Sequence, residues 1–178
     1  MSRGNRLETL YVLAAATGLR EAEPLALKWE DVELEETVLR VRHTLTRTGG
    51  KVALGPAKTK KSRRSVGLTG EAAEALRAHL AKQLEERERM GSLSRPEGLV
   101  FASEIGNLIN PSNLRNRFFA RLLKYAGLPS DTRFHDLRHT CATLLLSRNV
   151  NPKIVSERLG HSSIAITLDT YSHVLPTM

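Results

Sequence analysis

Residues 135–173 read HDLRHTCATLLLSRNVNPKIVSERLGHSSIAITLDTYSH, and this stretch decides the fold. Its pattern predicts three helices. His135 and Arg138 lie three residues apart at the start of the first helix, so their side chains share one face. An imidazole and a guanidinium placed in this way can meet one phosphate together. The helices are expected over about Asp136–Ser147, Pro152–Leu159 and Ile164–Val174.

Several upstream segments also carry apolar residues at helical spacing. The first reads as a short buried helix that closes at a Thr17-Gly18 break. The second contains Pro24, which a helix tolerates in its first turn. The last begins at Asn110-Pro111 and is ended by Gly127. These predicted helices span about Leu7–Ala16, Glu21–Trp29, Gly70–Arg89 and Asn110–Ala126.

Three short segments are predicted to be strands. Residues Thr37–Arg42 alternate apolar and polar side chains, which is typical of a half-buried strand. A turn at Thr48–Gly50 precedes the second strand, Lys51–Leu54, and the third is Arg64–Leu68. We therefore expect an α+β fold, mainly α-helical with a small three-stranded antiparallel sheet, built as a single domain over residues 1–178.

The charge balance indicates a polyanionic partner. Lys and Arg number 27 against 19 Asp and Glu, which gives a net charge of +8 and a pI near 10.1. Such a bias predicts attraction to nucleic acid that weakens as salt rises. The single cysteine, Cys141, excludes an internal disulfide and suits a reducing cytoplasm. No apolar run has the length of a membrane span, and no signal-peptide core follows the N-terminus, so we expect a cytoplasmic protein without a membrane partner.

The three tyrosines differ in their surroundings. Tyr11 and Tyr125 lie within apolar runs and are predicted to be core residues. Tyr171 lies among polar residues and is the candidate nucleophile. A phenol is mostly protonated at neutral pH, so it needs nearby cations and a base to ionise. The alternative is a packing tyrosine on an amphipathic helix.

Two arginines can supply the cations for phosphate chemistry. Arg20 and Arg138 carry planar guanidinium groups that grip phosphate oxygens bidentately. No cluster of Asp, Glu, Cys or His has the spacing of a metal site, so we expect no metal and no other cofactor. Each arginine taken alone could instead form a surface salt bridge. His135 and His161 could be structural histidines, and His139 is predicted to pack its helix.

Four motifs, Thr17-Gly18-Leu19-Arg20, His135-Asp-Leu-Arg138, Leu159-Gly160-His161 and Thr170-Tyr171-Ser172, resemble in their order the active site of tyrosine recombinases of the phage integrase family. The resemblance implies the catalytic fold of these enzymes. It implies site-specific DNA recombination or integration, in which Tyr171 forms a 3′-phosphotyrosine without metal or ATP. It also implies phosphate contacts from Arg20, Arg138 and His161, with His135 in the general-base position.

The resemblance extends to the basic run Lys58–Arg64. The family places a catalytic lysine in a turn between strands, where it protonates the departing 5′ oxygen. Lys58, followed by Thr59, resembles that residue, and Lys60 and Lys61 remain alternatives. Glu23 resembles the acidic residue that orients Arg20. The whole run could instead be a solvated hairpin edge or a targeting patch. Possible contacts to the DNA backbone are Lys60, Lys61, Arg63 and Arg64.

The two ends of the chain depart from the family pattern. A helical DNA-clamping domain usually precedes the catalytic domain, and a tail follows the tyrosine. Both are expected to be absent here, which predicts a catalytic domain cut from a longer protein. We expect this fragment to be a monomer, and the longer protein to assemble as a homotetramer on double-stranded DNA at a specific site. The alternatives are a type IB topoisomerase and a non-catalytic DNA-binding regulator on the same fold.

Overall fold

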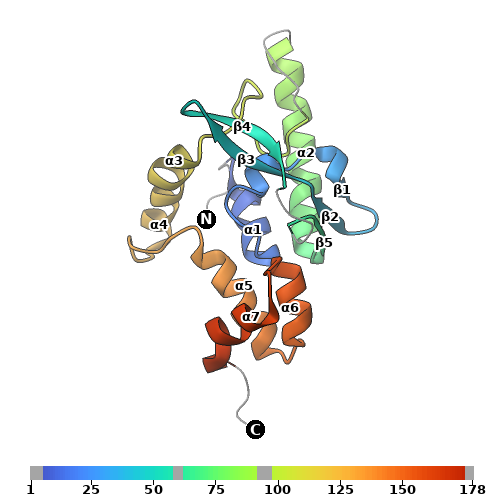
Figure 1. The fold of residues 1–178 in the computed structure, drawn as a ribbon. Helices are drawn as coiled ribbons and strands as arrows, with labels where there is room; N and C mark the ends of the chain where they lie inside the picture. Colours follow the sequence, from blue (N-terminus) through green and yellow to red (C-terminus); the bar gives the residue numbers. More distant parts are fainter. Residues whose placement is uncertain (1–5, 58–61, 92–97, 175–178) are drawn as a thin grey trace.

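Helix α1 (Glu8–Thr17) lies at the centre of the structure, with the other elements arranged around it (Figure 1). The computed structural model describes residues 6–57, 62–91 and 98–174. Because its sequence is apolar on most sides, α1 is buried against both α2 (Gly70–Met90) and α5 (Asp136–Ser147). Leu10 and Leu13 are fully buried in the main core. This helix confirms the first predicted helix and links the upper part of the molecule to the C-terminal part.

A three-stranded antiparallel sheet is present, but one of its strands differs from the prediction. Its order is β1 (Val32–Glu33), β2 (Val38–Val41) and β5 (Arg64–Gly67). The pair formed by Leu39 and Val66 is buried and joins the main core. The strands predicted at residues 37–42 and 64–68 are therefore confirmed within this sheet.

The strand predicted at residues 51–54 belongs to a separate hairpin. Among the described residues, strand β4 (Lys51–Pro56) pairs with β3 (His43–Thr48) alone, and β3 was not predicted. Gly49 and Gly50 both have positive φ, +58° and +77°, so they form the two-residue turn that favours pairing of the segments on either side. The prediction of one sheet was wrong because this local turn joins β4 to its immediate neighbour.

The helix predicted over residues 21–29 was also wrong. Only two short 3-10 turns form there, η1 (Pro24–Ala26) and η2 (Trp29–Asp31), and the residues between them are extended. The backbone instead pairs with the apolar segment at residues 98–100. Trp29 N–H donates to the Gly98 carbonyl over 2.8 Å, and Val100 N–H donates to the Leu27 carbonyl over 2.9 Å. Tertiary pairing therefore overrides the local helical pattern.

The helix predicted from Asn110 to Ala126 is present in three continuous parts, α3 (Pro111–Asn113), a π-helical turn η4 (Leu114–Phe119) and α4 (Ala120–Ala126). Tyr11 is buried as predicted, but Tyr125 is 65% exposed and is not a core residue. Tyr125 lies two residues after the buried Leu123, which places it about 200° around the helix and away from the core.

The C-terminal helices agree with the prediction. Below α1 in Figure 1 lie α5, α6 (Pro152–Leu159) and α7 (Ile164–Tyr171), followed by the 3-10 turn η5 (Ser172–Val174). They enclose a second, smaller core of Ala142, Leu146, Val155, Leu159 and Tyr171. Among the described residues, no helix combines the length and the apolar character that crossing a membrane requires.

Candidate active site

Three of the sequence motifs meet where α1 and α6 end and α5 begins. Arg138, at the start of α5, donates from Nη1 to the carbonyl of Gly18 over 2.6 Å and from Nη2 to that of Leu159 over 2.8 Å. Arg20 donates from Nη2 to the carbonyl of Gly160 over 2.8 Å. The two predicted phosphate-binding arginines therefore tie the three chain segments together as well as placing two positive charges side by side.

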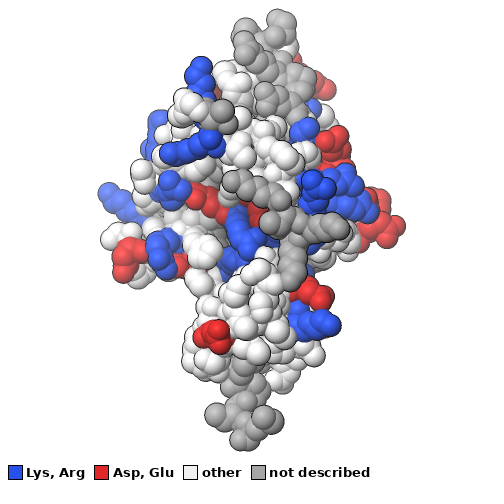
Figure 2. All heavy atoms as spheres, viewed as in Figure 1, with Lys and Arg blue, Asp and Glu red and all other residues white. Residues whose placement is uncertain are grey.

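Figure 2 shows Lys and Arg side chains gathered in the middle of one face, between the sheets and the C-terminal helices. Arg138 itself is 3% exposed, and burial followed by the charge of Arg20 lowers its pKa to about 10. The guanidinium therefore keeps its charge at neutral pH. A buried cation of fixed orientation in a region of low dielectric interacts strongly with an incoming anion.

Glu23 holds two arginines at this site. Its buried carboxylate accepts from Arg20, through the backbone N–H over 2.7 Å and Nη1 over 3.3 Å. It also accepts two bonds of 2.9 Å from Arg64 Nη1 and Nη2. Burial alone would raise the pKa of Glu23, but the contacts with Arg64 and Arg20 outweigh it and hold this pKa below its ordinary value. The predicted pairing of Glu23 with Arg20 is present, and Arg64 is a further, bidentate partner.

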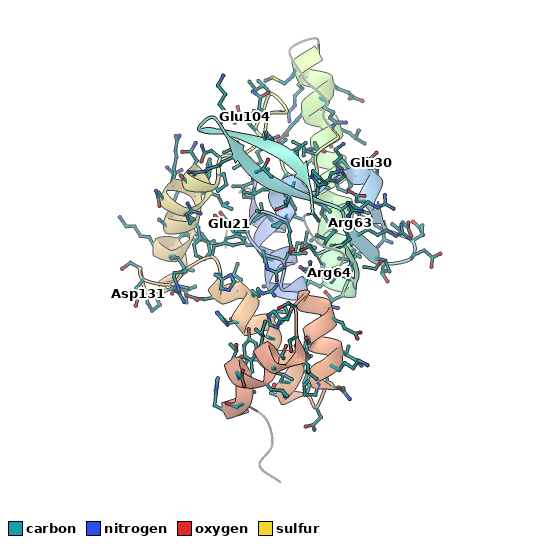
Figure 3. The ribbon with its side chains drawn as sticks, in the orientation of Figure 1. Glu21, Glu30, Arg63, Arg64, Glu104 and Asp131 are labelled. Carbon is teal, nitrogen blue, oxygen red and sulfur yellow. The ribbon has the colours of Figure 1, made fainter. Side chains whose placement is uncertain are left out.

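Arg64, predicted as a possible contact to the DNA backbone, is largely buried. Its side chain is 7% exposed, and besides Glu23 it donates from Nε to the Arg158 carbonyl over 2.6 Å. Figure 3 shows Arg63 and Arg64 between the sheet and the C-terminal helices. Arg63 is exposed, and both arginines line a cavity of about 410 Å³ together with Lys153 and His161. These contacts favour Arg64 as a residue that positions Glu23, and Arg63 as the arginine accessible to a phosphate.

His161 follows Gly160 at the end of α6 and faces the same arginines. Its Nδ1 lies 2.8 Å from Oγ1 of Thr167, which is fully buried on α7. Burial, followed by the charges of Arg138, Arg20 and Arg64, lowers the pKa of His161 to about 4. The ring is therefore neutral at pH 7. If the hydroxyl of Thr167 donates to Nδ1, the ring proton lies on Nε2 and can be donated to a phosphate oxygen.

We expect Thr167→Val to slow DNA cleavage about tenfold to a hundredfold, since the ring of His161 loses the bond that selects its tautomer. Thr167→Ser keeps the hydroxyl and should stay within about threefold of the parent chain. Single-turnover rates of covalent complex formation would measure both effects. A loss in Thr167→Ser with none in Thr167→Val would show that the methyl group matters rather than the hydroxyl.

The side chain of Tyr171 is less accessible than its polar neighbours suggest. Tyr171 is 3% exposed, and its ring packs in the C-terminal core. Burial raises its pKa, while the charge of Arg138 opposes the rise. Its hydroxyl lies 2.9 Å from Nδ1 of His139. The sequence reasoning gave His139 only a packing role and missed this contact.

His135 lies at the outer end of this row of side chains. It is exposed, and its ring centre lies 4.9 Å from that of His139, edge to face. Burial of part of the ring, followed by the charges of His139 and Arg138, lowers the pKa of His135. The four-residue spacing of His135 and His139 on a predicted helix was the signal that could have identified His139. Lys58, Lys60 and Lys61 lie outside the described residues.

One group of possible metal ligands lies away from this site. Atoms of Glu30, Asp31 and His43 lie within 4.8 Å of one another. The buried Asp31 carboxylate, however, already accepts 3.0 Å bonds from Arg42 Nη1 and from His43 Nδ1. These bonds explain the group as an anchor that ties β3 to η2.

We expect acid to destabilise the fold from about pH 6.5 downwards. Burial lowers the pKa of His79, His135 and His161 below the ordinary value of 6.5, so the unfolded chain binds more protons than the folded chain between pH 6.5 and about 4. Glu23, whose pKa is lowered below 4.5, adds to the loss at lower pH. Urea midpoints at pH 7, 6, 5 and 4.5 should fall steadily, and less steeply in His161→Gln. A constant midpoint between pH 7 and 5 would contradict these histidine shifts.

Comparison with known proteins identifies the family. The sequence model of the phage integrase family matches residues 2–178, nearly the whole chain. The chain belongs to the phage integrase family. Individual members of the family are similar to this chain over nearly its whole length. The XerC-like tyrosine recombinase of Caldanaerobacter subterraneus subsp. tengcongensis is 40% identical over 186 residues, which cover 98% of this chain and 47% of the relative.

Another member of the phage integrase family, the ICEBs1 integrase of Bacillus subtilis, is 31% identical over 172 residues, covering 95% of this chain and 45% of that protein. The chain therefore spans about half the length of these relatives.

Among solved structures, the Tn1549 transposon integrase in complex with transposon right end DNA superposes with a TM-score of 0.79 at 26% identity, covering 93% of this chain and 54% of that one. The XerA recombinase gives 0.74 at 26% identity, covering 99% and 61%. The expected fold class, the catalytic fold of tyrosine recombinases, is thus confirmed.

Proposed function

We propose that residues 1–178 form the catalytic domain of a site-specific tyrosine recombinase that cuts and rejoins DNA. The observation that carries this proposal is the meeting of Arg20, Arg138 and His161 beside the tyrosine-bearing helix, held by bonds between motifs distant in sequence. The similarity to a XerC-like recombinase and to an integrase solved with transposon DNA supports the same reading.

The proposed reaction begins with a DNA phosphate held by Arg20, Arg138 and His161. The two guanidinium groups grip the nonbridging oxygens, and the charge that builds up on these oxygens during attack strengthens both contacts. His161, neutral at pH 7, donates from Nε2. Because these residues supply positive charge and hydrogen-bond donors, the site needs no metal ion in this proposal.

Tyr171 then attacks the phosphorus. A bond forms between its phenolic oxygen and phosphorus, and the bond to the 5′ oxygen breaks, which leaves a 3′-phosphotyrosine and a 5′ hydroxyl. Lys58 is the proposed donor of the proton to the 5′ oxygen, with Lys60 and Lys61 as alternatives. Attack by the 5′ hydroxyl of a partner strand reverses these steps, so the energy of the broken bond is kept and ATP is not needed.

We further propose that the partner of this domain is double-stranded DNA at a specific site in the cytoplasm. The exposed Arg63 at the 410 Å³ cavity beside His161 supports a path for the DNA backbone across this face. The longer protein is proposed to act as a homotetramer on DNA, and the present chain to be a monomer in solution.

The test is covalent capture in the presence of EDTA. A pool of nicked duplexes with a randomised core is incubated with the protein, and DNA that stays bound after denaturation is amplified and sequenced. Mass spectrometry should find DNA on the peptide that contains Tyr171. Tyr171→Phe should form no adduct yet keep its thermal midpoint. An adduct on another residue would contradict the proposal. So would the absence of any adduct when a gel-shift assay shows that the protein binds the same DNA.

A further inference from the structure

A contact between α5 and α7 bears on how the nucleophile loses its proton. The hydroxyl of Tyr171 lies 2.9 Å from Nδ1 of His139, and the two ring centres are 5.7 Å apart. No hydrogen bond joins His135 to Tyr171 among the described residues, and the ring of His139 lies between them. The imidazole that touches the reacting atom is therefore that of His139.

The direction of this hydrogen bond follows from the state of the phenol. Burial raises the pKa of Tyr171 above 10, so the hydroxyl keeps its proton at neutral pH. Within the described residues, Nδ1 of His139 is the one hydrogen-bond partner of that hydroxyl. If Nδ1 carried a proton, the phenolic proton would have no acceptor there. The phenolic proton and the ring nitrogen are both satisfied when the phenol donates its hydrogen bond to an unprotonated Nδ1.

We propose that His139 is the catalytic base that takes the phenolic proton when Tyr171 attacks DNA, an inference that rests on the proposed function above. As the bond between the Tyr171 oxygen and phosphorus forms, the O–H bond breaks and its proton moves to Nδ1. In the rejoining step the phenolate leaves phosphorus and takes the same proton back. The proton on the 5′ oxygen is supplied and recovered separately by the acid on the leaving-group side.

The surroundings of His139 suit a transient imidazolium. Asp136 lies three residues earlier on α5, and its pKa is held below its ordinary value mainly by hydrogen bonds from Arg133 and, to a smaller extent, by the charge of His139. The other cationic or titratable groups of this segment are Arg138 on α5 and Arg133 and His135 just before it. His135 and His139 disfavour charge on each other. A base whose positive form is partly compensated can take the proton and return it.

The sharpest test compares His139→Asn with His139→Ala. An asparagine amide can occupy the place of Nδ1 and keep a hydrogen bond to the phenol, but it cannot take a proton. Adduct formation on the captured duplex is measured in single turnover between pH 6 and 9. We expect both variants to lose about a hundredfold or more at pH 7, the usual contribution of a general base. The rate of His139→Asn should then rise tenfold per pH unit, because only the ionised phenol reacts.

His173→Asn is the matched control, since His173 is exposed two residues after Tyr171. It should keep the parent rate and pH profile. Recovery of the parent rate in His139→Asn would reduce His139 to a positioning residue and overturn the proposal. A pH profile of His139→Asn with the same shape as that of the parent, lowered by a constant factor, would also overturn the proposal.

A second measurement does not depend on activity. Nitrogen NMR of the histidine-labelled protein at pH 7 should show Nδ1 of His139 unprotonated, and Tyr171→Phe should shift that resonance. A protonated Nδ1 would overturn the proposal even if the enzyme is active. If the parent chain forms no adduct at all, the proposed function fails, and the base assignment fails with it. An adduct in the parent with no effect of His139→Asn refutes the base assignment alone.

Discussion

Arg138→Gln should abolish adduct formation and also destabilise the fold, whereas Arg20→Gln should affect mainly the reaction. Both changes remove a guanidinium proposed to hold the phosphate, and loss of one such donor commonly costs about 100-fold to 1000-fold in rate. The two arginines differ in burial. Arg138 is 3% exposed, but the side chain of Arg20 is 40% exposed.

The difference in stability follows from the carbonyls that each arginine satisfies. Arg138 donates to Gly18 and Leu159, in the interior between α1 and α6. Each buried carbonyl left without a donor costs about 1–3 kcal/mol, so Arg138→Gln, which leaves two, should lose about 2–6 kcal/mol of unfolding free energy. Arg20 bonds one carbonyl near the surface, that of Gly160, and Arg20→Gln should lose about 1 kcal/mol or less.

Urea unfolding and single-turnover cleavage, measured on the same samples, separate the two effects. Arg148→Gln is the control, because Arg148 is exposed at the end of α5 and should change neither quantity. Equal destabilisation by the Arg138 and Arg20 changes would contradict the idea that Arg138 is a structural link. Unchanged cleavage in either variant would remove that arginine from the proposed phosphate site.

Much of the fold was predictable because its signals are local. The C-terminal helices begin at recognisable caps, such as Asn151 before α6 and Ser163 before α7, whose side chains accept the expected backbone N–H bonds. Gly127 and Gly160 end their helices in the left-handed conformation that glycine favours. Capping depends on a few adjacent residues, so one sequence suffices to locate it.

The wrong fold predictions concern which segments pair with one another, and a local pattern does not specify this. Residues 21–29 lack a helix because their backbone pairs with residues 98–100, which no local pattern indicates. Strand β4 was assigned to the wrong sheet because alternation gives a strand but not its partner.

The candidate site shows the same limit. The sequence indicated which residue types carry the chemistry, but not which of them touch. Arg64 was predicted as a possible contact to the DNA backbone, but its pairing with Glu23, which lies 41 residues earlier, was not predicted. His139 was assigned to packing, although its ring meets the hydroxyl of Tyr171, 32 residues later. These pairings arise only when α5, α6 and β5 pack together, so the geometry of the site needed the structure.

Gly18→Ala should be among the most damaging small substitutions in the chain. Gly18 has φ of +68° after α1, a conformation that costs a residue with a Cβ about 1–2 kcal/mol. An added Cβ would also lie 2.5 Å from Cδ2 of Leu159 and 3.4 Å from Sγ of Cys141. Overpacking of this kind adds about 1–3 kcal/mol, so we expect a total loss of about 2–5 kcal/mol of unfolding free energy.

Gly127→Ala is the matched control for this change. Gly127 ends α4 with φ of +66°, but a Cβ there would meet nothing within 4 Å, so its loss measures the backbone cost alone. The excess loss in Gly18→Ala then measures the packing of Leu159 against this turn. The Gly18 carbonyl also accepts a hydrogen bond from Arg138 Nη1, so a shifted turn would displace this arginine. The variant should therefore cleave DNA at least about tenfold more slowly even where it remains folded. Equal losses of unfolding free energy in the two glycine variants would show that the side chain of Leu159 moves aside without an energetic penalty. Unchanged cleavage would show that this turn does not set the position of Arg138.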